Sequence, residues 1–164
     1  MRFIYWLSAW GSGACLIAMT LLILAQIVAR FIGVIIPSSE DFAGWLLSAT
    51  IFFGLAYTFH TGGHIRLTIL LGRLSDKPRR IFEIFTLLVG TAIVAYMAYY
   101  TAFTVYESYD FDDVSDTYLP VPLWWVQLPM AVGSFTLLLA FLESLVLLLM
   151  GKTPNYMTQE QEEL

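Results

Sequence analysis

Residues 123–150 read LWWVQLPMAVGSFTLLLAFLESLVLLLM. Glu143 is the one charged residue in this run, and the run shows no alternation of apolar and polar residues. A helix rises about 1.5 Å per residue, and the hydrocarbon core of a bilayer is about 30 Å thick, so that about 20 apolar residues are enough to cross it. The run is also far too long for a strand of a membrane barrel. It therefore predicts a transmembrane helix.

Three earlier stretches have the same character. The four predicted spans cover approximately residues 3–29, 42–60, 81–106 and 123–150. We therefore expect an all-α integral membrane protein with four transmembrane helices, in which residues 1–164 form a single four-span membrane domain.

The composition supports this class. Charged residues make up 13% of the chain and apolar residues 59%, against about 25% and about 45–50% in soluble domains. So few charges cannot cover the surface of a soluble protein of this size. The composition excludes an ordinary soluble enzyme and a disordered chain, and the net charge of −5 argues further against a nucleic-acid partner.

The segment between the second and third spans predicts one more element. On a helical wheel Leu67, Leu70, Leu71 and Leu74 share one face, and Arg66 and Arg73 lie on its flank. We expect a short interfacial amphipathic helix at about residues 65–74. Before the second span, residues 37–41 (PSSED) are typical of a helix start, with a serine for the cap and acids in the first turn.

The basic residues predict the orientation of the chain. Seven of the eight Lys and Arg residues fall on the side that holds both termini, and Arg30 alone lies on the other side. The positive-inside rule therefore puts both termini in the cytoplasm. Residues at the ends of the spans are candidates for contact with the lipid interface: Arg73, Lys77, Arg79, Arg80, Trp6, Trp10, Trp124 and Trp125.

The opposite side is acidic. The loop between the third and fourth spans carries five candidates for docking a protein outside the membrane: Glu107, Asp110, Asp112, Asp113 and Asp116. Plain solvation of the loop is the alternative interpretation. Tyr96, Tyr99 and Tyr100 lie in the outer half of the third span, and anchoring at the interface is their simplest interpretation.

Ionisable residues deep in a membrane usually mark function, and the central parts of the first three spans have none. Glu143 lies roughly 10 Å deep, by its distance from the end of its span. It is either a proton or ion site, or a carboxylate that is paired with a basic group of a neighbouring helix or protonated in lipid. His60 and His64 have the spacing of a metal pair, but Gly62-Gly63 between them argues against a continuous helix. We expect no catalytic, cofactor or metal site, and hence no enzyme.

Several motifs around the second span resemble a known family. They are Ala29-Arg30-Phe31, Ser39-Glu40-Asp41-Phe42, Phe53-Gly54-Leu55-Ala56-Tyr57, Gly63-His64-Ile65-Arg66 and the later run at 119–124, LPVPLW. Together they resemble the small membrane subunit (Q subunit, DctQ-type) of tripartite ATP-independent periplasmic (TRAP) transporters.

The resemblance implies an accessory or scaffold subunit in the bacterial inner membrane. It would pack against a large membrane transport subunit, which would hold the substrate and sodium sites, while a periplasmic binding protein delivers an organic acid. Candidates for the subunit interface or for structural pairing are Arg30, Glu40, Asp41, His64, Arg66 and Glu143. Arg30 is expected to pair with Glu40 or Asp41 at the outer boundary, because these residues lie at the same depth.

Two other classes of membrane protein are also compatible with the sequence. A small self-contained transporter would need an essential buried charge such as Glu143. A membrane anchor of a redox complex would need haem-binding histidines on different helices, whereas His60 and His64 share one loop.

Overall fold

The computed structural model describes residues 2–61 and 76–151. These residues form the helices α1 (Arg2–Phe31), α2 (Ser39–His60), α4 (Asp76–Asp110) and α5 (Leu123–Leu149). All four are long and apolar enough to cross a membrane. The prediction of an all-helical protein with four spans is therefore confirmed. The predicted interfacial helix at 65–74 lies outside the described residues.

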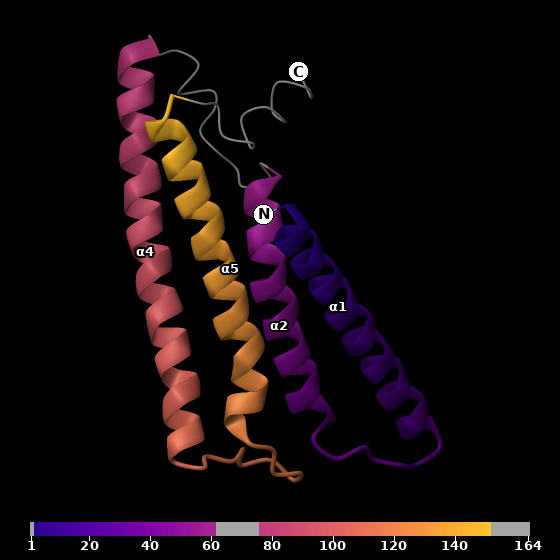
Figure 1. Ribbon diagram of the computed structural model, residues 1–164. Coiled ribbons are helices and arrows are strands. Elements are labelled where there is room, and N and C mark those ends of the chain that lie inside the picture. The colour runs from indigo at the N-terminus through magenta and orange to yellow at the C-terminus, as the bar shows by residue number, and fades with distance from the viewer. Residues whose placement is uncertain (1, 62–75, 152–164) are drawn as a thin grey trace.

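The helices stand in a row rather than in a closed bundle (Figure 1). Their order in space is α1, α2, α5, α4, because α1 packs on α2, α2 on α5 and α5 on α4, whereas α1 touches α5 only slightly. The loops at 32–38 and 111–122 lie at one end, which we call the turn end. The start of α1 and the end of α5 lie at the other, which we call the terminal end (Figure 1).

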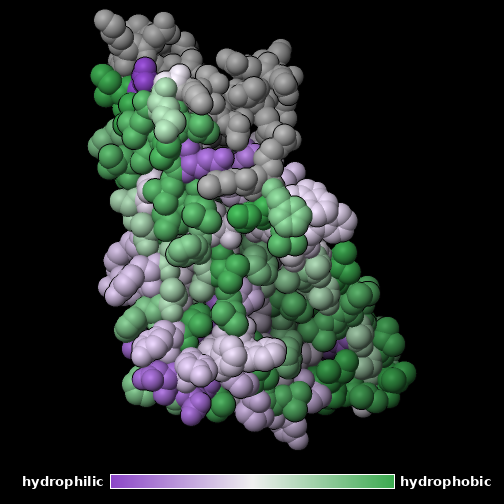
Figure 2. Space-filling model, viewed as in Figure 1, coloured by the Kyte–Doolittle hydropathy of each residue, from purple (hydrophilic) through white to green (hydrophobic). Residues whose placement is uncertain are grey.

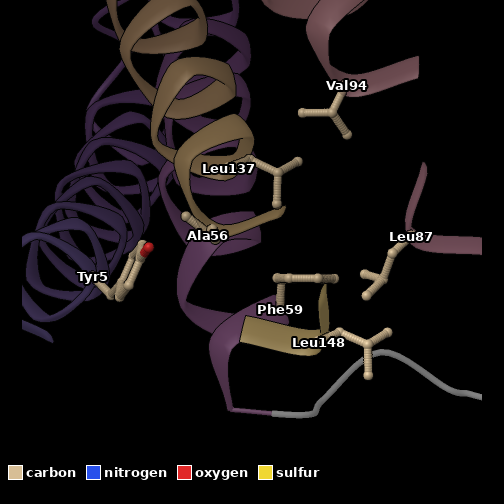
Figure 3. Packing of buried hydrophobic residues seen from close by; sticks show 8 residues of the cluster. Tyr5, Ala56, Phe59, Leu87, Val94, Leu137 and Leu148 are labelled. Atoms are coloured by element: carbon tan, nitrogen blue, oxygen red, sulfur yellow. The ribbon is translucent and has the colours of Figure 1, made fainter. Parts of the chain in front are cut away.

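The buried core runs across the row and is richest near the terminal end. Its residues come from all four helices: Tyr5, Ala56, Phe59, Leu87, Val94, Leu137, Ala140 and Leu148. In Figure 3 Tyr5 approaches from α1, while Leu87 and Val94 approach from α4, and α2 and α5 fill the space between. The rings of Phe59 and Phe141 stack at 3.9 Å between centroids, which holds α2 against α5.

Much of the remaining surface is hydrophobic (Figure 2). No residue in the most apolar stretch of α1 is buried. In the most apolar stretch of α5 only a third of the residues are buried. In water such exposure would be costly, but lipid chains solvate apolar side chains, so that a single layer of helices is stable there without a second layer.

Close contacts between helices replace the hydrophobic driving force that lipid removes. The Ser8 hydroxyl donates to the Phe53 carbonyl at 2.6 Å, and the Ser12 hydroxyl to the Thr50 carbonyl at 2.8 Å, which ties α1 to α2. The hydroxyls of Thr101 and Ser134 lie 2.8 Å apart and tie α4 to α5.

The α2–α5 contact is closest at Gly133. A Cβ atom added there would lie 2.5 Å from both the carbonyl carbon and the carbonyl oxygen of Phe52. The obstruction is backbone, which cannot swing away as a side chain does. Glycine is therefore required at this position for α2 and α5 to approach each other.

The start of α2 has the expected acidic residues but not the expected serine cap. Glu40 and Asp41 lie in the first turn of α2 as predicted, but Ser38 is left-handed (φ 56°) and makes no side-chain cap bond. Its hydroxyl accepts a bond from the Leu119 amide at 3.2 Å instead, which joins the two loops of the turn end. Pro78 lies within the first turn of α4, where the missing N–H has no intrahelical partner to lose.

Replacing Gly133 with alanine should push α2 and α5 apart. We expect Gly133→Ala to lower the free energy of unfolding by about 1–3 kcal/mol, the usual cost of overpacking. Titration of the purified protein with SDS would measure it. Gly13→Ala is the matched control, because an added Cβ at Gly13 meets nothing within 4 Å. Equal stability of the two variants would contradict the close approach.

Candidate functional site

The strongest polar contact between distant parts of the chain lies at the terminal end. The Tyr5 hydroxyl donates a hydrogen bond of 2.6 Å to Oε2 of Glu143. Tyr5 is only 2% exposed, and its ring lies 4.6 Å from the ring of His60 between centroids. Residues of α1, α2 and α5 therefore meet in one small cluster, which we call the Tyr5 cluster (Tyr5, His60 and Glu143).

This cluster changes the interpretation of Glu143. A carboxylate in a helix that crosses a membrane needs a partner, because the hydrocarbon offers none. Tyr5 supplies that partner with its hydroxyl, at 2.6 Å. The arrangement holds the ends of three helices together. Among the described residues no group of three or more His, Cys, Asp or Glu side chains could bind a metal ion.

Arg30 and Glu40 come together at the turn end. They line one pocket of about 430 Å³ with Gln26, Ile27 and Phe31. The pocket lies at the turn end, between the end of α1 and the start of α2. The pocket brings the two charged groups to the same place in the fold. Their expected pairing remains a prediction, and Asp41 is exposed beside them.

The acidic loop is ordered by its own backbone. The Ser115 amide donates to the Val121 carbonyl at 2.9 Å, the Leu123 amide donates to the Asp113 carbonyl at 2.9 Å, and Val114 forms a β-bridge with Pro122. All five predicted docking residues are exposed around this framework: Glu107, Asp110, Asp112, Asp113 and Asp116. The structure thus presents a fixed acidic surface at the turn end.

The aromatic candidates lie at the helix ends. Trp6 and Trp10 are 54% and 63% exposed near the terminal end, and their rings are 5.4 Å apart. Trp124 and Trp125 lie at the start of α5, where the Trp124 ring also meets Tyr109 at 5.6 Å. These positions fit residues that sit at a membrane interface.

Arg80 has a role that its place in the sequence did not indicate. Its Nη2 donates to the Leu148 carbonyl at 3.3 Å, one of the last carbonyls of α5. The Gly151 amide also donates to this carbonyl, at 3.1 Å, so that Arg80 adds a second bond from α4 to the end of α5. His64, Arg66 and Arg73 lie outside the described residues, and so do the side chains of Lys77 and Arg79.

Comparison with known proteins adds one finding. The family model described as "Tripartite ATP-independent periplasmic transporters, DctQ component" matches residues 19–151. This match covers all of α2, α4 and α5 and residues 19–31 of α1. A search of curated proteins found no match.

The Tyr5–Glu143 bond can be measured by a double-mutant cycle. We expect Tyr5→Phe and Glu143→Leu to show a coupling of about 1.5–3 kcal/mol in the free energy of unfolding, the usual range for a hydrogen bond to a charged group. SDS titration of the single and double variants gives the coupling. Tyr57→Phe on α2 is the control for loss of a hydroxyl, since Tyr57 is 42% exposed. Additive effects of the two substitutions would show that the bond does not stabilise the fold.

Proposed function

Since the chain belongs to the DctQ component family of tripartite ATP-independent periplasmic transporters, we propose that it is the accessory scaffold subunit of such a transporter. It packs against the large transport subunit in the membrane. The complex takes up an organic acid, a carboxylate, with the energy of a sodium gradient.

The distribution of ionisable groups carries the proposal. In the described parts of the four helices, the one carboxylate well inside a span is Glu143, and Tyr5 already binds it. A carrier that moves a carboxylate and sodium needs polar groups near mid-membrane that are free to bind them. The described helices offer no such set of ionisable groups, so that we assign the substrate and sodium sites to the large subunit.

The shape of the chain fits a supporting role. A single row of helices has two broad faces and two edges, and a protein that encloses a substrate needs a second layer. Contacts between the helices are mostly hydroxyl-to-backbone bonds and close packing, which favour one fixed arrangement. We therefore assign the chain to the static part of the transporter.

We assign different binding partners to the two ends of the row. The turn end faces the periplasm of a bacterium, and its acidic surface docks the substrate-binding protein. The terminal end faces the cytoplasm, as the distribution of Lys and Arg indicates. There His64 and Arg66 contact lipid headgroups or the large subunit.

Reconstitution tests the proposed role. We expect sodium-driven uptake of a radiolabelled carboxylate into proteoliposomes only when this chain, the large subunit and the binding protein are all present. Omission of this chain should lower the initial rate at least about tenfold, because the large subunit then lacks its support. The chain alone should show no uptake. Uptake by the chain alone, abolished by Glu143→Gln, would overturn the proposal in favour of a self-contained transporter.

The acidic loop can be tested by neutralising three of its charges. We expect the triple change Asp112→Asn, Asp113→Asn and Asp116→Asn to slow the association of the binding protein severalfold at low salt and to flatten its salt dependence. Stopped-flow association with the reconstituted complex measures both effects. Changing Glu160, Glu162 and Glu163 to Gln removes the same charge from the C-terminal segment and serves as control. An unchanged rate and salt dependence would remove the docking role.

A further inference from the structure

The face of α4 that points away from α5 carries a group of tyrosines. α4 packs on α5 through Leu87, Val94 and Ala98, which are buried. Tyr96 and Tyr99 lie on the opposite side of the helix and are 66% and 65% exposed. We call Tyr96, Tyr99, Tyr100 and Phe103 the tyrosine face.

These tyrosines lie well inside the span rather than at its end, about 10–16 Å by helical rise from Glu107, the nearest charged residue of α4. The apolar span of α4 runs from Arg80 to Asp110, and Tyr96, Tyr99 and Tyr100 occupy its middle third. A second observation supports this depth. Thr101, which follows Tyr100, bonds to Ser134, and Ser134 lies near the middle of α5. Tyr99 is about 16 Å from the last residue of α4 by helical rise. Anchoring at the interface therefore does not explain these residues.

The tyrosine hydroxyls need partners at that depth. Their rings contact one another, with centroids 4.5 Å apart for Tyr96 and Tyr100 and 5.3 Å apart for Tyr99 and Tyr100. Within the described part of the chain, however, none of the three hydroxyls has a hydrogen-bond partner. A hydroxyl in hydrocarbon without such a partner costs free energy. A tyrosine side chain is also too short to reach water from this depth in a core about 30 Å thick.

Lipid chains cannot supply what these hydroxyls lack, but another protein can. A transmembrane helix with acceptor oxygens at the same depth would satisfy them, either through Ser, Thr, Asn or Gln side chains or through the free carbonyls of an interrupted helix. α4 is an edge of the row, so that its outer face is accessible along its length (Figure 1).

We propose that the tyrosine face of α4 is the surface on which the large membrane subunit docks, through hydrogen-bond acceptors that it presents at the depth of these tyrosines. The identity of this partner rests on the function proposed above. The surface itself follows from the depth, exposure and hydrogen bonding of the three tyrosines. The edge formed by α1 is the less suitable surface. Its exposed side chains Ile17 and Leu21 are apolar and lipid solvates them, and the exposed Thr20 hydroxyl already donates to the Leu16 carbonyl.

Removal of the hydroxyls alone tests the proposal. The triple variant Tyr96→Phe, Tyr99→Phe and Tyr100→Phe keeps the rings and their apolar area. Interhelical hydrogen bonds in membranes contribute a factor of about 2.7 each to an association constant, so that the triple variant should bind the large subunit about 20-fold more weakly. Energy transfer between fluorophores on this chain and on the large subunit, titrated in proteoliposomes, measures the affinity.

A second triple variant provides the matched control. Tyr57, Tyr109 and Tyr118 are exposed and lie near helix ends or in the acidic loop, where water reaches their hydroxyls. Changing all three to Phe removes the same number of hydroxyls and should leave the affinity unchanged. Stability in SDS titration should be unchanged in the tyrosine-face variant, because its hydroxyls make no bond within the described chain.

The outcomes separate this inference from the proposed function. Failure of the wild-type chain to bind the large subunit would overturn both. Wild-type binding with equal affinity of the tyrosine-face variant would overturn the tyrosine face alone. Energy transfer between two copies of this chain that the same variant abolishes would show that a second copy covers the face, and would overturn the inference as well.

Discussion

The packing of α2 against α5 is the contact on which the rest of the structure depends. The pairs α1–α2 and α4–α5 each resemble a hairpin, and only this contact joins them broadly, with Tyr5 and Glu143 adding one bond across the terminal end. The contact is close because Gly133 leaves room for the backbone at Phe52. In lipid, where burial of apolar surface gives little gain, such close approach supplies the attraction between helices. Loss of it would free the two pairs from each other.

The same constraint explains why the chain has so few polar groups inside the membrane. Each hydroxyl at an interhelical contact already binds a carbonyl or another hydroxyl, as Ser8, Ser12 and Thr101 do. The carboxylate of Glu143 binds Tyr5. The polar groups of the row thus hold the row together and leave no set for a transported ion. The tyrosine face is the exception, and it points away from α5.

The sequence predicted the parts of this structure that depend on local pattern. Long apolar runs are sufficient to identify four spanning helices, and motifs in and around the second span pointed to the family that the family model then matched. Partners far apart along the chain were beyond such reasoning: Glu143 was singled out by its charge, but nothing in the pattern pointed to Tyr5. Gly133 looks like any glycine in an apolar run, and only the approach of Phe52 gives it a role. Arg80 was interpreted as a lipid contact, whereas the structure adds its bond to α5. The depth of Tyr96, Tyr99 and Tyr100 likewise required the true ends of α4.

The open row is the central claim, and one distance tests it most directly. Spin labels at Ile17 of α1 and Ile93 of α4, both 63% exposed, would be placed in a chain with Cys15→Ser and measured by pulsed electron spin resonance in lipid. Two helices, α2 and α5, lie between α1 and α4 in the row. Three spacings of about 8–10 Å therefore predict that the axes of α1 and α4 are about 25–30 Å apart, both in the chain alone and in its complex with the large subunit. A closed bundle with α1 and α4 as neighbours would give about 8–10 Å between the axes, and that result would contradict the account.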